Sequence, residues 1–215
     1  MRKWLWGGMT ISALLVSGYA IVLFVILGAN AAPLIQGKLE QFSLSEWWYA
    51  MLYVHIVFSV VALAIGPFAL SEKIRSRNIV RHRRLGKLYM LGIGLGGLSG
   101  LYLAFYASGG LGGKLGFGVM AVLWLLTATL ALTAIRRKQI VGHQHWMIRN
   151  YALTLAAVTL RIYLPLFMAF GDEAYFETAY AIIAWMCWVP NLVIAELMVR
   201  YMRRKASSHA SFVRS

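Results

Sequence analysis

The chain has 215 residues, of which 60% are hydrophobic and only 13% are charged, and its mean hydropathy is +0.68. A soluble globular domain is closer to half apolar and a quarter charged, so this composition excludes an ordinary soluble enzyme and indicates a chain surrounded largely by lipid. The length suits one helix bundle rather than two domains. The single cysteine, Cys187, excludes an internal disulfide framework.

Apolar runs predict six membrane-spanning helices, each long enough to cross a hydrocarbon core of roughly 30 Å. The predicted spans cover about residues 4–28, 47–70, 88–107, 115–135, 150–170 and 179–199. We therefore expect an all-α polytopic membrane protein in which residues 1–205 form a single transmembrane helix bundle. The chain after Arg200 is basic and serine-rich, and we expect residues 206–215 to form a disordered cytoplasmic tail.

The first span has two interpretations. It follows the basic start Met1-Arg2-Lys3, as a signal peptide does, and Ala29-Asn30-Ala31 resembles a cleavage site. Its apolar run is about 25 residues, however, which is longer than the roughly 7–15 residues of a signal sequence. A retained helix is therefore favoured, and the sequence leaves cleavage open.

The cationic residues lie mainly on one side of the predicted bundle. The N-terminus, residues 71–87, residues 136–149 and the tail hold all but three of the 21 lysines and arginines, the exceptions being Lys38, Lys114 and Arg161. The positive-inside rule then places both termini in the cytoplasm and predicts a multi-pass protein of the cell inner (plasma) membrane. The net charge of +14 is explained by topology, with anionic lipids as partners at the cytoplasmic face and no nucleic acid.

Two predicted spans carry packing signals. One face of the second span has a polar-to-small stripe at helical steps: His55, Ser59, Ala62 and Gly66. This stripe should face protein rather than lipid. The third span has glycines at four-residue spacing, typical of closely packed membrane helices: Gly92, Gly96 and Gly100. The same stretch matches GxGxxG, but no strand precedes it, so we reject nucleotide binding.

The membrane interior contains polar residues that we expect at one depth. Arg161 lies about 11 residues into the fifth span, roughly 16 Å deep, and His55 and Asn191 lie at nearly the same level. Pro165 and Pro190 each remove a backbone donor and predict kinks. The pattern predicts a small polar pocket. In a structural interpretation, Arg161 bonds freed carbonyls and Asn191. In a functional one, His55 binds a ligand or transfers a proton, and Arg161 holds a carboxylate or haem propionate.

A second group of histidines lies at the cytoplasmic ends of the spans. His82 precedes the third span, and His143 and His145 precede the fifth. Helix N-termini disfavour imidazolium, and neutral imidazole is the form that binds metal or haem iron. Nearby arginines could balance haem propionates: Arg81, Arg83, Arg84 and Arg149. The alternative is a set of interfacial histidines with Trp146 as an anchor. A non-haem metal site is weaker, since few carboxylates lie on this side.

The sequence contains no nucleophile elbow, P-loop, HExxH or CxxC motif, so hydrolase and kinase chemistry have no support. It does contain a distinctive set of segments around His55: HRRLGKLY at 82–89, GGLSGLYLA at 96–104, GFGVMAVLWLLTA at 116–128 and HQHWMIRNYALTLAAVTLRIYLP at 143–165. Over about residues 50–170 the chain resembles a bacterial family of predicted integral membrane proteins, domain of unknown function 2306.

The resemblance implies an integral membrane protein without an assigned activity. Its pattern includes these positions: His55, His82, His143, Trp146, Met147, Arg149 and Arg161. His145 stands where a basic residue is more usual, which favours His143 over His145 as a ligand. A looser likeness to membrane b-type cytochromes is an analogy at fold level only.

The first functional hypothesis is a haem-binding or redox-type membrane protein carrying haem b. Its cofactor-binding residues would be His55, His82, His143 and Arg161, and a metal would use His82, His143 and His145. His82 and His143 share a level, whereas His55 would need an open second axial position or a ligand from another chain.

The second hypothesis is a non-catalytic accessory or assembly subunit, or a small carrier, within a homo-oligomer or larger membrane complex. The third is an enzyme acting on a lipid or quinone, suggested by aromatic residues in the spans: Tyr102, Tyr163, Trp185 and Trp188.

Overall fold

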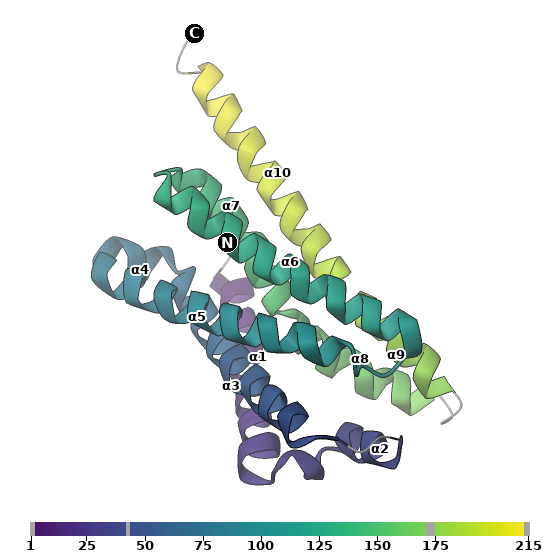
Figure 1. Cartoon of the computed structure of the whole chain (residues 1–215). Coiled ribbons are helices and arrows are strands. Elements are labelled where there is room, and N and C mark those ends of the chain that lie inside the picture. Colours follow the sequence, from purple (N-terminus) through teal and green to yellow (C-terminus); the bar gives the residue numbers. More distant parts are fainter. Residues whose placement is uncertain (1–2, 42–43, 171–174, 213–215) are drawn as a thin grey trace.

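The computed structural model describes residues 3–41, 44–170 and 175–212, and every regular element among them is a helix (Figure 1). In chain order these are α1 (Lys3–Ile21), the π-helical turn η1 (Val22–Ile26), the 3₁₀ turn η2 (Ala29–Ala31), α2 (Pro33–Gln41), α3 (Glu46–Ala69), α4 (Glu72–Arg77), α5 (Ile79–Ala104), α6 (Gly110–Arg136), α7 (Ile140–Thr154), α8 (Ala156–Phe170), α9 (Phe176–Met186) and α10 (Val189–Phe212).

Six helical stretches in the described residues are long and apolar enough to cross a membrane, which confirms the prediction of an all-α, six-span bundle. The third begins at Ile79, well before the predicted residue 88, because the Asn78 side chain accepts a hydrogen bond from the Arg81 amide at 2.8 Å and caps the helix there. Hydropathy marks where the apolar environment starts, whereas the cap marks where the helix starts. The basic segment 79–87 is therefore helical.

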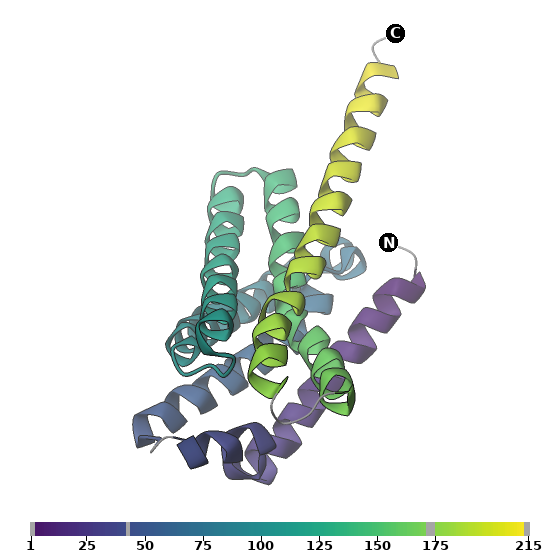
Figure 2. The same ribbon diagram turned by 90° about the vertical axis from the view of Figure 1, so that its right-hand side faces the viewer.

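The last two spans are each divided into two helices. α7 ends at Thr154 and α8 begins at Ala156, and Figure 2 shows α8 turning away from the line of α7. α9 ends at Met186 and α10 begins at Val189, immediately before Pro190, which cannot donate a backbone hydrogen bond. By contrast, α8 continues through Pro165.

The C-terminal helix extends well beyond the bundle. α10 runs to Phe212, so residues 206–212 are helical where we expected disorder, and residues 213–215 lie outside the described chain. Figure 1 shows the second half of α10 projecting past the ends of α6 and α7. Lys, Arg and Ala, which are strong helix formers, fill positions 203–206 and account for this extension.

α3 and α5 pack with their backbones close together along the glycines of α5. A Cβ atom at Gly92 would lie 2.8 Å from the Phe58 carbonyl oxygen, and one at Gly96 would lie 2.8 Å from Ser59 Oγ. At Gly66 on α3, a Cβ atom would lie 2.0 Å from the Tyr151 ring. Both packing predictions are confirmed: the α3 stripe faces protein, and the α5 glycines permit close approach.

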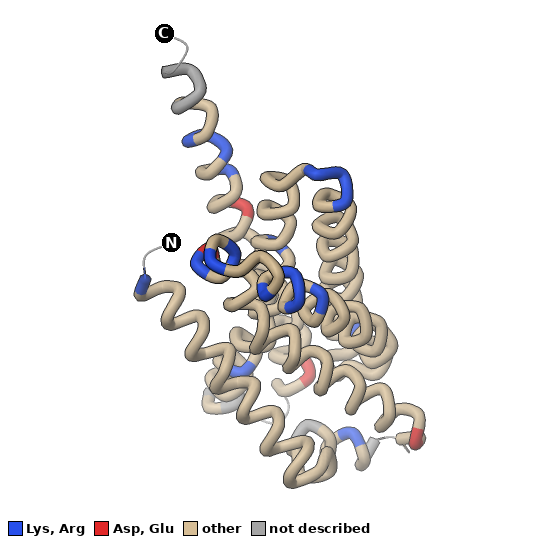
Figure 3. The backbone as a smooth tube through the Cα atoms, turned by 90° about the vertical axis from the view of Figure 1, so that its left-hand side faces the viewer, with Lys and Arg blue, Asp and Glu red and all other residues tan. Residues whose placement is uncertain are grey.

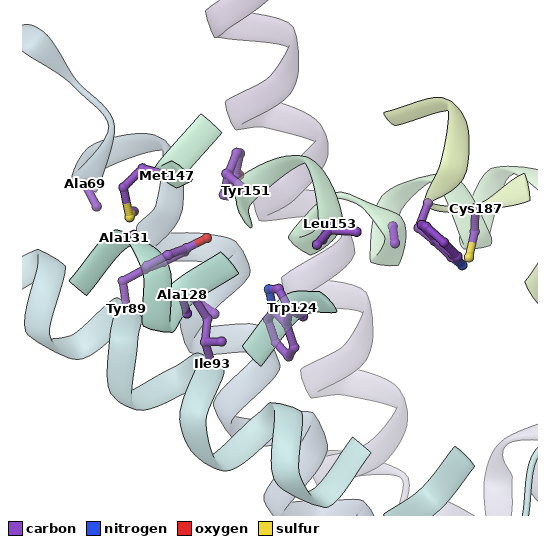
Figure 4. Packing of buried hydrophobic residues seen from close by; sticks show 13 residues of the cluster. Ala69, Tyr89, Ile93, Trp124, Ala128, Ala131, Met147, Tyr151, Leu153 and Cys187 are labelled. Atoms are coloured by element: carbon purple, nitrogen blue, oxygen red, sulfur yellow. The ribbon is translucent and has the colours of Figure 1, made fainter. Parts of the chain in front are cut away.

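The main core lies where α3, α5, α6 and α7 meet. Tyr89, Ile93, Trp124, Met147 and Tyr151 are buried there, and Figure 4 shows their side chains among the surrounding helices. The Tyr151 ring, for example, packs against Gly66 of α3, in the space that a larger side chain there would occupy.

A buried hydrogen-bond network ties this core together. The Tyr89 hydroxyl donates to Asn150 Oδ1 at 2.7 Å, and Asn150 Nδ2 donates to the Trp124 carbonyl and to Thr127 Oγ1, each at 2.8 Å. Trp124 Nε1 donates to Thr154 Oγ1 at 2.8 Å. Because these groups bond one another across three helices, they fix α5, α6 and α7 in register.

Candidate functional site

A cavity of about 280 Å³, partly open on one side, lies within the bundle. Its walls come from α3, α5, α6 and α8, and α2 contributes residues at one end. Most of the lining is apolar or aromatic, and the polar or titratable lining residues are Lys38, His55, Ser59, Tyr106, Thr154, Arg161, Tyr180 and Cys187. An apolar cavity with few convergent polar groups is the usual form of a small-molecule site.

His55 is held in one orientation by α5. Its Nδ1 lies 2.7 Å from the Gly96 carbonyl oxygen, and since a carbonyl only accepts, Nδ1 carries the proton and donates. Nε2 is then the unprotonated ring nitrogen and is available as an acceptor or ligand. The ring fits because Gly100 has no side chain: a Cβ atom there would lie 2.8 Å from Nδ1.

Arg161 lines the same cavity from α8, as the depth argument predicted. Its Nη1 donates to the Ala157 carbonyl oxygen at 2.9 Å, and its guanidinium carbon lies 5.9 Å from the centre of the Tyr19 ring. Its Nε is buried without a hydrogen-bond partner. Ion pairs in the described part of the chain involve Arg75, Arg149 and Arg200, and none involves Arg161. The guanidinium charge is therefore uncompensated by the residues that the structure describes.

Two further cavity residues have unpartnered polar atoms. Ser59 Oγ and Trp48 Nε1 are both buried without a hydrogen-bond partner, and the Trp48 side chain is only 3% exposed. Burying a polar group without a partner costs free energy, so such groups are typical of positions that meet a ligand or an ordered water.

Lys38 stands at the α2 end of the cavity. Its Nζ donates to the Tyr106 carbonyl oxygen and to Ser108 Oγ, which ties α2 to the α5–α6 connector. Burial lowers the pKa of Lys38 below its ordinary value, while the nearby Glu177 carboxylate opposes that shift. Lys38 is thus a second cation facing the same cavity.

Asn191, which we expected beside Arg161, does not line this cavity. Its Nδ2 donates to Thr159 Oγ1 at 2.9 Å and to the Cys187 carbonyl oxygen at 3.1 Å. It joins α8 to the break between α9 and α10. The hydrogen bond between Arg161 and Asn191 in the structural interpretation is absent from the described contacts, since Arg161 bonds Ala157 instead.

The second group of histidines lies near the starts of α5 and α7. His82 and His143 are close enough to interact electrostatically. His143 Nδ1 lies 2.9 Å from the Ala131 carbonyl oxygen, so Nδ1 donates and Nε2 is left free. His145 is buried at 5% exposure. Among the described residues, no three His, Cys, Asp or Glu side chains gather as a metal site would require.

Arg149, expected to balance a propionate, is already paired. Its Nε and Nη2 donate to Glu196 Oε2 at 2.9 and 2.6 Å, and its guanidinium lies 4.8 Å from the centre of the Trp146 ring. Glu196 Oε1 also accepts from Arg200 at 3.2 Å. These contacts hold α10 against α7 and leave Arg149 less available for a bound anion.

Residues 52–199 match the model of the predicted membrane proteins of domain of unknown function 2306. The chain belongs to this family. The match includes His55, His82, His143 and Arg161, and it confirms the resemblance seen in the sequence motifs. No curated protein and no solved structure matches the chain.

In this family member, sequence reasoning missed several cavity residues. Lys38 and Trp48 precede the matched segment; Lys38 lies between the first two predicted spans, and Trp48 lies at the start of the second. The turn at η1 and η2 brings α2 back against the end of α5, so Lys38 meets residues far from it in the sequence. The spacing of residues along the chain gave no indication that α2 contacts the end of α5.

Proposed function

We propose that this protein binds haem b in the cavity between α3, α5 and α8 and acts as a redox-type membrane protein. The observation that carries the proposal is that His55 and the uncompensated guanidinium of Arg161 line one cavity. The ligand must offer His55 Nε2 a donor or a metal ion, and must offer Arg161 an anion.

The tautomer of His55 supports a metal ligand. Histidines that bind metals commonly donate their other ring nitrogen to a carbonyl, which fixes the ring and increases the basicity of the ligating nitrogen. The bond from Nδ1 to Gly96 O is of this kind. An anion alone would be repelled by the lone pair on Nε2, so a group that combines a metal centre with carboxylates suits both residues better.

The environment of Arg161 supports a carboxylate. A cation inside a membrane bundle is costly unless it is paired or solvated. Arginine presents a fork of donors that matches a carboxylate and remains charged when buried. A haem propionate would supply the missing negative charge, and Lys38 at the other end of the cavity is a second cation for such a group.

The residues fit haem in kind. The cavity, at about 280 Å³, is slightly smaller than the roughly 300–1,000 Å³ typical of ligand pockets and is partly open, so haem would extend beyond it. When bound, haem would supply one-electron chemistry. The chain would hold the iron through His55 and a propionate through Arg161, while apolar walls from Phe117 and Met120 exclude water.

We also propose an orientation in a bacterial inner membrane with both termini in the cytoplasm. Most lysines and arginines lie in α4, the start of α5, around the α6–α7 connector and in the outer half of α10, and Figure 3 marks these positions in blue. Lys38 lies in α2 and Lys114 lies near the start of α6. The positive-inside rule supports a cytoplasmic location for the cation-rich end.

The test is an absorbance spectrum of the full chain purified in mild detergent, supplemented with haem, and recorded oxidised and then reduced with dithionite. We expect a Soret band that shifts on reduction, is lost in His55→Ala and remains in His82→Ala and His143→Ala. A band lost only in the latter two variants would place haem at the cytoplasmic histidines and refute the cavity assignment. A colourless protein without metal by elemental analysis would refute haem binding.

Arg161→Leu tests the carboxylate contact separately. We expect its haem affinity to fall roughly tenfold to a hundredfold, as for a lost charge-assisted hydrogen bond. Iron protoporphyrin dimethyl ester, whose propionates are blocked, should bind the wild type and the variant equally. Equal affinities of the two proteins for unmodified haem would contradict this role of Arg161.

A carrier of a small organic anion is the second candidate, and the two divided spans favour it. Broken helices at mid-membrane depth are common where transporters bind substrates. Both breaks adjoin the cavity, since Thr154, Ala156 and Cys187 line it. Uptake of radiolabelled carboxylates into proteoliposomes, lost in Arg161→Leu and present without haem, would favour this function over the redox one.

A further inference from the structure

A second concave site lies outside the bundle, where α4 meets the start of α5. It is a groove of about 240 Å³ lined by Lys73, Ile74, Arg77, Asn78 and Arg81. It shares no residue with the cavity that contains His55. The short helix α4 and the cap of α5 therefore form a site that is separate from the proposed haem site, and its Arg81 is one of the arginines that the sequence had offered for haem propionates.

The cations of this groove have no acidic partner in the described part of the chain. Glu72, the neighbouring acid, pairs with Arg75 at 3.4 Å and not with Lys73, Arg77 or Arg81. Asn78 uses its Oδ1 to cap α5. Three positive charges around one hollow favour a ligand with concentrated negative charge, and two guanidinium groups match the oxygens of a phosphate.

The position of the groove favours a lipid as the source of that phosphate. Leu85 and Leu88 follow in α5, and the helix then continues into the membrane span, so the groove lies where the chain passes from polar to apolar surroundings. Ile74 adds an apolar wall, and Figure 3 shows the cationic residues of α4 and α5 side by side. Inorganic phosphate would contact only the cationic residues, whereas the acyl chains of a phospholipid would also contact the apolar residues.

We propose that the groove binds the phosphate of an anionic phospholipid, with Lys73, Arg77 and Arg81 around the head group and the acyl chains along the α5 surface. The inference is independent of the cavity, and it rests on the proposed orientation only for the leaflet concerned. Arginine and lysine near an anionic membrane surface each strengthen binding by a modest amount, and three together make a specific site.

The experiment is native mass spectrometry of the full chain in detergent, with dioleoyl phosphatidylglycerol or dioleoyl phosphatidylcholine added. The test variant combines Lys73→Gln, Arg77→Gln and Arg81→Gln. The matched control combines Arg136→Gln, Arg137→Gln and Lys138→Gln, which removes the same charge from exposed residues of the α6–α7 connector. We expect phosphatidylglycerol retention to fall roughly tenfold to a hundredfold in the test variant and to stay near wild type in the control.

Equal losses in the two triple variants would overturn the proposal, because only bulk charge would then matter. Displacement of the lipid by an equal concentration of inorganic phosphate would also overturn it, because the site would then take free phosphate. The single variant Arg77→Gln gives a second reading if the triple variant is poorly folded: a partial loss supports the groove, and wild-type retention contradicts it. None of these lipid-binding measurements requires haem, so they can refute the lipid site without bearing on the proposed haem site.

Discussion

The ring of His55 occupies the place where a side chain at Gly100 would begin, since a Cβ atom there would lie 2.8 Å from Nδ1 and 2.9 Å from Cε1. Gly100 is thus a condition for the bond from His55 to Gly96 O, one turn earlier on the same helix. Gly100→Ala should push the imidazole aside, break that bond and cost about 1–3 kcal/mol of unfolding free energy. Haem affinity, if haem is the ligand, should fall as well.

The control for this substitution lies on the same helix. Gly94→Ala introduces the same methyl group at a site with nothing within 4 Å, so it should be neutral or slightly stabilising. Thermal unfolding of both variants in detergent provides the comparison. Equal midpoints would show that the ring of His55 yields without cost, contrary to the prediction.

Asn150 should be the most sensitive polar residue of the core. It is fully buried and bonds Tyr89, the Trp124 carbonyl and Thr127 at once. Asn150→Leu leaves these partners short of hydrogen bonds and should destabilise the protein by about 2–4 kcal/mol. Thr129→Val removes an exposed hydroxyl that bonds only Leu125 O within its own helix, and should change stability by less than about 0.5 kcal/mol. Chemical denaturation in mixed micelles would measure the free energy of unfolding of both variants, and equal changes in the two would contradict the prediction.

The half-buried ion pair between Arg149 and Glu196 should hold α10 to α7. The Arg149 side chain is 12% exposed and that of Glu196 is 35% exposed. Glu196→Gln weakens three charge-assisted hydrogen bonds, two from Arg149 and one from Arg200, and should cost about 1–2 kcal/mol. We expect faster amide hydrogen exchange in α10 around Val199, while the interior of α5 stays protected.

Glu72→Gln is the matched control, because Glu72 pairs with Arg75 at the surface with 86% of its own side chain exposed. Exposed pairs contribute roughly 0–1 kcal/mol, so this variant should behave like the wild type. If both variants leave exchange in α10 unchanged, the ion pair does not hold the helix.

Lys38 should give the protein a distinct pH dependence. Since burial lowers its pKa in the folded state, the unfolded chain binds more protons between the lowered pKa and the ordinary value of 10.5. The contribution of Lys38 to the free energy of unfolding therefore rises with pH between the lowered pKa and 10.5. Below the lowered pKa, the destabilisation caused by burying the charged ammonium group is present in full. Comparing wild type with Lys38→Met from neutral pH to about pH 10.5, we expect the difference to move in favour of the wild type as pH rises. A constant difference would contradict the burial of a charged Lys38.

The sequence predicted the features that depend on local periodicity. Hydropathy located six spans, four-residue spacing located a close helix contact at Gly92 and Gly96, and depth placed His55 and Arg161 at one level, where both line the cavity. These predictions succeed because a membrane restricts the chain to helices of known rise that begin and end at known levels.

Features that depend on which helices are neighbours were not predictable in this way. Asn191 was placed at the correct depth for Arg161, but it meets Thr159 on another side of α8, and depth alone does not fix the direction of a side chain. The break at Leu155 has no proline beside it to announce it. Arg149 looked free in sequence, and only the packing of α10 on α7 shows its pairing with Glu196.

The two walls of the cavity differ in stiffness. His55 belongs to the seam of α3 and α5, where backbones touch and neither helix can rotate without a clash at Gly92 or Gly96. Arg161 belongs to α8, a half-length helix that starts after the break at Leu155. A rotation of α8 at Leu155 would change the width of the cavity without separating α3 from α5. His55 therefore lies on the more rigid wall of the cavity, and Arg161 lies on the wall that would move to fit a bound ligand.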